Sequence, residues 1–185
     1  MRVMRNCRWI PILGVLVLLV PAFAQQGERL APFVPSPQTV VERMLELADL
    51  KQGETVYDLG CGDGRILITA AREFRAKAVG IELSDPLVKQ DREQVKRLGL
   101  ENRVSVVQGD LMQADLRPAD VVTVYLLTEV NDQLKPLFER SLHPGARVVS
   151  HDFKIRGWKP DRVDEVVVSG RAHKIYVYIM PPHKG

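Results

Sequence analysis

The chain has 185 residues, of which 45% are hydrophobic and 26% charged; this composition suits one globular domain and excludes a disordered, collagen-like or multi-span membrane protein. Its two cysteines are too few for a disulfide framework. The net charge of +3 is carried by three arginines in residues 1–24, which contain no acid, and the near-neutral remainder predicts no nucleic-acid partner.

Residues 1–24 have the layout of a secretory signal. A basic start precedes an apolar run over residues 9–20, and Pro21-Ala22-Phe23-Ala24 then offers an A-x-A cleavage site. Cleavage after Ala24 predicts an exported (periplasmic) protein. The alternative is an uncleaved membrane anchor through residues 9–20, although this run is short for a span of ~20 residues. Both place the following chain outside, because arginines stay on the cytoplasmic side.

The remaining chain divides into a linker and pre-strand segment, residues 25–35, and a domain over residues 36–185. Ser36 and Pro37 predict a helix start, with the Ser36 hydroxyl as cap. Helical and β-rich segments then alternate. We predict helices at 37–48, 65–74, 85–98 (capped by Ser84) and 129–142 (kinked or restarted at Pro136), and strands at 55–59, 78–81, 104–107, 121–126 and 147–150.

This alternation predicts a parallel sheet with helices on both faces. The end of the chain differs, because residues 163–168 and 174–179 read as two strands joined by Ser169-Gly170-Arg171 with no helix between them. They predict an antiparallel hairpin at the sheet edge. Such a hairpin could also pair with a second copy. The predicted fold class is therefore α/β, with five parallel strands and a C-terminal edge hairpin.

The most informative stretch is the loop 58–64, Asp-Leu-Gly-Cys-Gly-Asp-Gly, between the first predicted strand and the next helix. Glycines at alternate positions let the backbone turn sharply and approach a ligand closely. Open α/β sheets bind ligands at this end of their strands. We predict a ligand-binding loop, and the alternative is a tight turn with a structural role only.

Two classes of ligand suit such a loop. A dinucleotide needs G-x-G-x-x-G, but the third glycine position is Arg65, and Asp58 and Asp63 bring negative charge toward the pyrophosphate. S-adenosylmethionine carries an ammonium and a sulfonium, which these acids favour. Glu82, ending the second strand, can accept two hydrogen bonds from a ribose diol, and Asp110, after the third, can accept one from the adenine amino group. We therefore predict S-adenosylmethionine as the cofactor.

The whole pattern resembles the class I S-adenosylmethionine-dependent methyltransferases, over nearly all of the chain after residue 24. The resemblance implies a Rossmann-like sheet. It also implies that Asp58, the acid before the first glycine, helps to hold the methionine part of the cofactor. The predicted cofactor-binding set is Asp58, Gly60, Cys61, Gly62, Gly64, Glu82, Asp110 and Leu111.

Cysteine and histidine chemistry is not predicted. Cys61 is interpreted as a small residue inside the loop rather than a nucleophile, because no activating partner is identifiable. The four histidines are scattered along the chain, and Cys61 stands alone once residues 1–24 are removed, so we predict no metal site.

Residues 32–37, Pro-Phe-Val-Pro-Ser-Pro, are stiff and extended. Together with the stretches 58–65, 125–127 and 158–160, they resemble a narrower group. These are small, membrane-associated protein-lysine methyltransferases related to the enzymes acting on mitochondrial ATP synthase subunit c and the adenine nucleotide carrier. The resemblance implies a protein lysine as acceptor, and a membrane protein as one candidate. We predict an acceptor channel lined by Phe33, Val34 and Pro35; a rigid linker is the alternative.

Methyl transfer to lysine needs a neutral amine. A free lysine has a pKa of about 10.4, so deprotonation at pH 7 costs about 4.6 kcal/mol, and an apolar, aromatic channel lowers that cost. We predict Tyr125, at the end of the fourth strand, as the catalytic residue, with its ring facing the amine and its hydroxyl accepting a hydrogen bond. An ordinary core tyrosine is the alternative. Asn131 and the pair His151-Asp152 are further candidates for the channel rim.

Three functions therefore remain open: a protein-lysine methyltransferase, a small-molecule methyltransferase, and a non-catalytic protein that binds adenosyl ligands. The third is motivated by location, because an exported domain would lie where this cofactor is not made. The absence of a large inserted lid favours a macromolecular acceptor.

Overall fold

The computed structural model describes residues 34–185, so the predictions for residues 1–24, the linker up to residue 33, and Phe33 lie outside the described residues. Within residues 34–185, no helix is long and apolar enough to cross a bilayer. The helices are α1 (Gln38–Leu47), α2 (Arg65–Glu73), α3 (Asp85–Arg97), the short 3₁₀ helix η1 (Leu111–Gln113) and α4 (Thr128–Ser141). The strands are β1 (Thr55–Leu59), β2 (Lys77–Glu82), β3 (Val104–Gln108), β4 (Val121–Val124), β5 (Arg147–His151), β6 (Trp158–Lys159), β7 (Arg162–Val168), β8 (Arg171–Ile179) and β9 (His183–Lys184).

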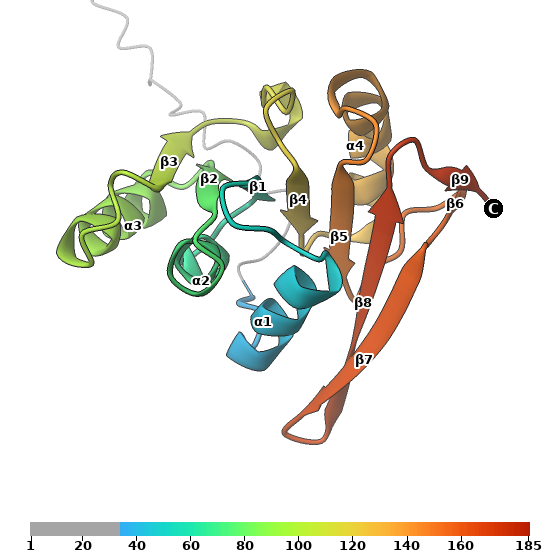
Figure 1. The fold of residues 1–185 in the computed structure, drawn as a ribbon, viewed down its shortest axis with the longest axis horizontal. Coiled ribbons are helices and arrows are strands. Elements are labelled where there is room, and N and C mark those ends of the chain that lie inside the picture. The colour runs from blue at the N-terminus through green and yellow to red at the C-terminus, as the bar shows by residue number, and fades with distance from the viewer. Residues whose placement is uncertain (1–33) are drawn as a thin grey trace, which may run out of the picture.

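Seven of these strands form one sheet in the order β3-β2-β1-β4-β5-β8-β7 (Figure 1). The first five are parallel, β8 runs antiparallel to β5, and β7 runs antiparallel to β8 at the edge. The predicted α/β class, with five parallel strands and an edge hairpin, is confirmed. The parallel strands all end at one edge of the sheet, which we call the carboxyl edge.

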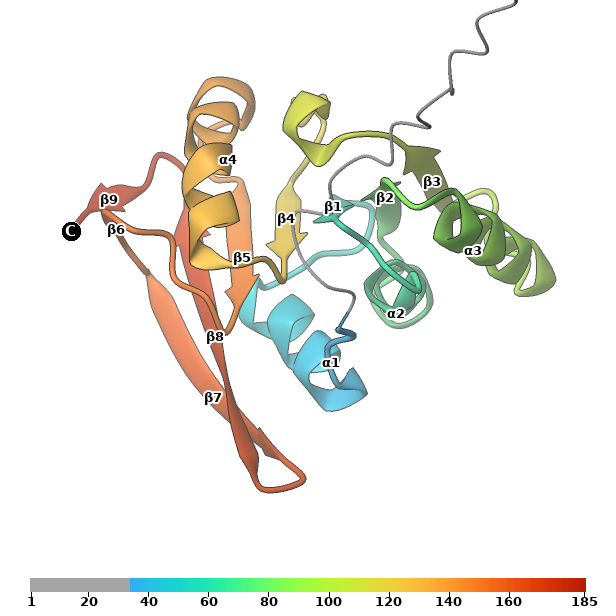
Figure 2. The same cartoon turned by 180° about the vertical axis from the view of Figure 1, so that it is seen from behind.

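Helices cover both faces of the sheet, as predicted (Figures 1 and 2). The first three pack on one face, where the α1 stripe of Val40, Val41, Met44 and Leu45 joins a core with β-strand valines and alanines. The other face is covered by α4, through Leu134, Phe138 and their neighbours. Because β4 lies between these layers, all four of its residues are buried, which explains why three of them are valines.

The β7–β8 hairpin projects past the carboxyl edge beside α1 (Figure 1). Its register shows this directly, since the last residue of β5, His151, pairs with Ile175, and residues 171–174 of β8 lie beyond the end of β5. Beyond the end of β5 the hairpin is held by β7–β8 pairing, by packing against α1, and by Val166 and Val168, which pack on the core. The hairpin therefore places the start of β8 next to the ends of β4 and β5.

Four local predictions need correction. Ser36 is not a helix cap: α1 begins at Gln38 after Pro37, and the Ser36 hydroxyl is bonded to a distant histidine. Ser84 precedes α3, but its side chain makes no capping hydrogen bond. Pro136 lies inside one continuous α4, because apolar residues on both sides of it pack on the sheet. The fourth strand ends at Val124 rather than at residue 126, which leaves Tyr125 beyond the last strand pair.

The structure also contains elements that the sequence did not predict. Strands β6 and β9 form a separate two-stranded sheet, with Trp158 opposite Lys184. The helix η1 follows β3 and begins at Leu111, with Asp110 as its cap. Each has two or three residues, which is too short to produce a recognisable hydrophobic period.

Candidate active site

The glycine loop turns at the carboxyl end of β1 in the left-handed conformations that favour glycine. Gly60, Gly62 and Gly64 have φ angles of 79°, 61° and 70°. The amide of Gly60 donates to the carbonyl of Ile81 at 2.8 Å, which fixes the loop against the end of β2. A Cβ at Gly64 would lie 3.3 Å from Cγ of Asp91. Backbone conformation and close packing therefore both select glycine in this loop.

Glu82 lies directly beside this loop. Its Oε2 accepts the amide N–H of Gly62 at 3.1 Å, and its Oε1 accepts the amide N–H of Ser84 at 2.8 Å. These bonds fix the orientation of the carboxylate and occupy one acceptor position on each oxygen. Because each carboxylate oxygen has two such positions, Glu82 can still receive both hydroxyls of a ribose diol.

Asp58 is buried at the centre of the loop. Its Oδ1 accepts the hydroxyl of Thr123 on β4 at 2.8 Å. Burial, together with the nearby carboxylates of Asp63, Glu82 and Asp91, raises the pKa of Asp58 to about 7. Four acidic side chains thus converge on one loop. A cation bound there would relieve their repulsion, which fits the ammonium and sulfonium of S-adenosylmethionine and not a pyrophosphate.

Asp91, on α3, belongs to this acidic group and was not predicted. It is 1% exposed, and its Oδ1 has no hydrogen-bond partner, while its Oδ2 lies 3.7 Å from the Cys61 thiol. Burial raises the pKa of Asp91 to about 7. The sequence did hold a signal, since Val88, Asp91 and Val95 share one face of the helix, and an acid in an apolar stripe is unusual.

Arg65 connects the loop to the segment that precedes α1. Its Nε donates to both oxygens of Asp63, at 2.8 and 3.1 Å. Its Nη1 donates to the backbone carbonyl of Ser36 at 2.7 Å. Arg65, which stands where a dinucleotide motif needs its third glycine, therefore holds Ser36 beside the glycine loop.

The predicted adenine end of the site follows β3. Asp110 is exposed, and its Oδ1 accepts the amide N–H of Met112 at 2.9 Å, which caps η1. Leu111 is half-buried and packs against the core under α4. Both lie at the carboxyl edge, two strands from Asp58, and their contact with adenine remains a prediction.

Cys61 has the structural position that the sequence suggested. It is buried, and both burial and the surrounding carboxylates raise the pKa of its thiol, which disfavours a nucleophilic thiolate. A Cβ placed on Gly80 of β2 would lie 2.6 Å from its Sγ. Cys61 therefore fills space over Gly80 and presses the loop onto the sheet.

Tyr125 lies just beyond β4, in contact with the end of β5. Its ring stacks on that of His151, with centroids 3.8 Å apart and planes inclined by 27°. Its hydroxyl donates to Oδ2 of Asp152 at 3.3 Å. Burial raises the pKa of Tyr125, and so does the Asp152 carboxylate, so the hydroxyl stays protonated at neutral pH. The hydroxyl oxygen in turn accepts a hydrogen bond from Nη2 of Arg171 at 3.4 Å.

Of the other residues predicted to line the acceptor channel, two are exposed and one is buried. Val34 and Pro35 are exposed and precede Ser36. Asn131 is fully buried, and its Nδ2 donates to the carbonyls of Leu126 and Phe153 and to the Ser150 hydroxyl, at 3.2 to 3.3 Å. Its Oδ1 has no partner. Asn131 thus ties α4 to the ends of β4 and β5, and a lining role for any of these residues stays a prediction.

Two histidines that seemed scattered meet at the carboxyl edge. His151 Nε2 lies 2.9 Å from Nδ1 of His173, on β8, and His151 Nδ1 lies 2.8 Å from the Ser36 hydroxyl. Ligand atoms of His151, Asp152 and His173 all lie within 4.8 Å of one another. Burial lowers the pKa of His151 to about 4, so it is neutral at pH 7. The prediction that the histidines are scattered is wrong, because β5 and β8 are sheet neighbours.

Comparison with known proteins agrees with this geometry. A family model described as the ANTKMT methyltransferase domain matches residues 58–162. A protein-lysine N-methyltransferase of Saccharolobus islandicus is 48% identical over 154 residues, which cover 83% of this chain and 96% of that protein. The adenine nucleotide translocase lysine N-methyltransferase of Mus musculus is 36% identical over 145 residues, covering 78% of this chain and 63% of the mouse protein.

A solved structure extends the comparison to the cofactor. The RNA methyltransferase from Salinibacter ruber, in complex with S-adenosylhomocysteine, is 48% identical with a TM-score of 0.75, covering 80% of this chain and 94% of that chain. S-adenosylhomocysteine is the product that S-adenosylmethionine leaves after methyl transfer, in keeping with the glycine loop and acidic group described above. The chain therefore belongs to the ANTKMT family of class I S-adenosylmethionine-dependent protein-lysine methyltransferases.

Proposed function

We propose that this enzyme methylates the side-chain amine of a lysine in a protein that lies in or at a membrane. The lysine acceptor is supported by the 48% identity to the Saccharolobus islandicus enzyme, and a membrane acceptor by the mouse relative, whose name gives a translocase as its substrate. The observation that carries the proposal is the arrangement at the carboxyl edge. The acidic glycine loop and the aromatic, polar end of β4 lie there side by side, one suited to the cofactor and the other to an amine.

Residues of the glycine loop and β2 would bind the cofactor, and Tyr125 after β4 would bind the lysine amine. When bound, S-adenosylmethionine supplies an electrophilic methyl carbon, and the electron pair of the broken carbon–sulfur bond stays on sulfur. Asp58 and Glu82 bind and orient this group through its charge and its hydroxyls. Tyr125 offers the lysine amine an aromatic face and a hydroxyl oxygen that can accept a hydrogen bond from it.

A direct experiment uses the purified full chain. Calorimetric titration with S-adenosylmethionine and S-adenosylhomocysteine measures cofactor binding. Methyl-labelled cofactor is then supplied with membrane proteins and, separately, with soluble proteins, and methyl-lysine is identified by mass spectrometry. Methyl-lysine on a membrane protein is the expected result. Cofactor binding without transfer to any protein would contradict the proposed function.

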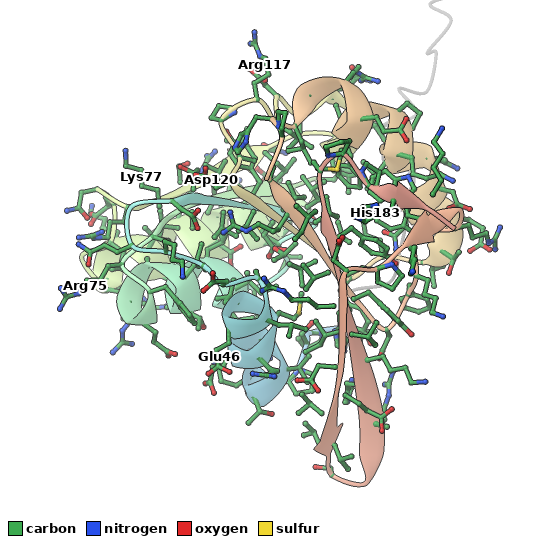
Figure 3. All side chains as sticks on the ribbon, turned by 45° about the vertical axis from the view of Figure 1, so that its right-hand side comes forward. Glu46, Arg75, Lys77, Arg117, Asp120 and His183 are labelled. Atoms are coloured by element: carbon green, nitrogen blue, oxygen red, sulfur yellow. The ribbon has the colours of Figure 1, made fainter. Side chains whose placement is uncertain are left out.

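RNA is a second candidate acceptor, since the Salinibacter ruber relative is named as an RNA methyltransferase. The charge distribution of this chain argues against it. After residue 24 the chain has equal numbers of basic and acidic residues. Three exposed basic residues, Arg75, Lys77 and Arg117, point outward (Figure 3). Arg75 and Arg117 lie in loops, and Lys77 begins β2 at the edge opposite the glycine loop. A parallel incubation with total RNA tests this acceptor, and labelled RNA without labelled protein would select it.

We further propose that residues 1–24 bring the enzyme to a membrane, as a signal or an anchor. Their basic start and apolar run support this location. Fusing residues 1–40 or residues 25–40 to a phosphatase that is active only outside the cytoplasm tests it. We expect activity with the first fusion and none with the second. An inactive first fusion would contradict an exported location.

A further inference from the structure

A group of polar side chains beside Tyr125 centres on one carboxylate, that of Asp152. The residue follows β5 with a φ of 61°, a left-handed conformation that is uncommon for a residue other than glycine. Its side chain is only 15% exposed. Oδ1 accepts the amide N–H of Lys174 at 2.9 Å, and Oδ2 accepts from Arg171 at 2.9 Å and from Tyr125 at 3.3 Å. A strained backbone thus holds a mostly buried anion at the acceptor end of the site.

The positive charge that balances this anion comes from Arg171. His151 does not supply it, because burial lowers the pKa of this residue and keeps it neutral, and its ring nitrogens are engaged by Ser36 and His173. Arg171 donates from Nη2 to Asp152, yet its side chain is 60% exposed. An ion pair with one exposed partner is weakly held, whereas the buried carboxylate still requires a cation. Arg171 is therefore exchangeable for another positive group.

The same atoms also resemble a metal donor set, but their contacts favour an organic cation. The 2.9 Å distance between Nε2 of His151 and Nδ1 of His173 is that of a hydrogen bond. Oδ2 of Asp152 lies farther away, 3.5 Å from His151 and 3.6 Å from His173. That oxygen already receives N–H and O–H donors. A group with one positive charge and several N–H donors matches this environment.

We propose that Asp152 binds the ammonium of the acceptor lysine, and that Arg171 occupies the same position until the acceptor displaces it. The inference rests on the proposed function. Arg171 begins β8 on the part of the hairpin that projects past the carboxyl edge, so its side chain can leave without disturbing the core. The Tyr125 hydroxyl already donates to Asp152, and its oxygen, which accepts from Arg171 at 3.4 Å, would accept from the lysine instead. Asp152 is thus a recognition residue for a positively charged side chain.

The experiment uses n-butylammonium chloride, which reproduces the lysine side chain, and n-butanol as its uncharged counterpart. Binding to the full chain is measured by NMR or calorimetry with saturating S-adenosylhomocysteine. We expect the wild type to bind the ammonium in preference to the alcohol. Asp152→Asn should weaken ammonium binding at least tenfold, and Arg171→Gln should strengthen it several-fold, because the competing guanidinium is gone. Binding of the alcohol should not change.

A matched acid–arginine pair provides the control. Arg43 and Asp164 join α1 to β7, with side chains 42% and 33% exposed, so Arg43→Gln and Asp164→Asn should leave ammonium binding as in the wild type. If Arg171 served only to position Asp152, Arg171→Gln would weaken binding instead. That result, or equal binding of amine and alcohol to the wild type, would overturn the proposal. If a thermal melt shows that Asp152→Asn does not fold, the Arg171→Gln variant tests the proposal by itself. Stronger ammonium binding by this variant would support the proposal, and weaker binding would overturn it.

Different experimental outcomes would reject the inference about Asp152 and the proposed protein-lysine acceptor. Methyl-lysine formed by the wild type, together with ammonium binding that is indifferent to Asp152, would reject the inference alone. Ammonium binding that depends on Asp152, without labelled lysine on any protein, would support amine recognition and reject the protein acceptor. With an acceptor protein in hand, Asp152→Asn should raise KM for that protein more than it lowers kcat, whereas cofactor binding should not change.

Discussion

The hydroxyl of Ser36 lies 2.8 Å from Nδ1 of His151, although the two residues are 115 positions apart. The carbonyl of the same serine accepts a hydrogen bond from Nη1 of Arg65, the first residue of α2, which also donates to Asp63 of the glycine loop. One residue thus joins the loop expected to hold the cofactor to the histidine that stacks on Tyr125. Ser36, just ahead of α1, therefore lies between the two halves of the candidate site.

Ser36→Ala tests this connection. Removing the hydroxyl leaves a fully buried ring nitrogen without a partner, which costs about 1–3 kcal/mol in the free energy of unfolding. We expect this loss in denaturant unfolding, with a rise in KM for the acceptor, because Tyr125 loses its ordered neighbour. Ser105→Ala on the exposed side of β3 is the control and should change neither quantity. Equal stability of the two variants would contradict the proposed connection.

Glu82 is the residue on which cofactor affinity should depend most clearly. Replacing it with Ala removes a charged acceptor of two ribose hydrogen bonds and also releases the Gly62 amide, so binding should weaken by about 2–3 kcal/mol. Calorimetry with S-adenosylhomocysteine measures the effect. Glu101→Ala, at an exposed position before β3, should bind as the wild type does. An unchanged affinity in Glu82→Ala would remove this residue from the site.

Cofactor binding should depend on pH through Asp58. Its pKa of about 7 in the free protein means that the carboxyl is partly protonated at neutral pH. The cofactor ammonium favours the carboxylate, so binding lowers this pKa, releases protons, and becomes tighter as the pH rises from 6 to 8. Calorimetry at pH 7 in buffers of different ionisation enthalpy measures the protons released.

Asn variants separate the contributions of the two buried acids. Asp58→Asn should bind the cofactor weakly and lose most of the pH dependence, whereas Asp91→Asn should lose only part of it, because Asp91 also titrates near pH 7. For folding, the raised pKa of Asp58 means that its contribution to stability falls as the pH rises from about 4 toward 7. Asp58→Asn should therefore gain stability relative to the wild type at pH 8. A flat wild-type pH profile of cofactor affinity would refute this account.

Gly80→Ala should destabilise the fold through overpacking. The added Cβ would lie 2.6 Å from both Sγ of Cys61 and Cδ1 of Leu67, and we expect a loss of about 1–3 kcal/mol in the free energy of unfolding. A second substitution, Cys61→Ala, should recover part of the loss by removing one of the two clashing atoms. Gly109→Ala is the control, because nothing lies within 4 Å of its added Cβ. A Gly80→Ala protein as stable as this control would show that the loop does not press on β2.

The local pattern of the sequence determined the alternation of helices and strands, the edge hairpin, and the identity of the cofactor. Each of these features depends on residues that are neighbours in the sequence. A short apolar run forms a strand, and alternate glycines flanked by acidic residues form a loop that suits a cationic ligand. The relatives confirm the methyltransferase class that these residues indicated. Roles for individual residues, such as Glu82 and Tyr125, remain predictions that the geometry makes specific.

Only the tertiary structure decided which distant polar groups meet. Ser36 was expected to cap a helix, but packing of α1 places it against β5, 115 residues away. His151 and His173 become neighbours because β8 turns back antiparallel to β5, which sequence spacing does not reveal. Asp91 meets Cys61 of the glycine loop only because α3 packs on the same face of the sheet. Hydrogen bonds and charge pairs of this kind depend on distances in space, and those are set by the packing of the whole sheet and its helices.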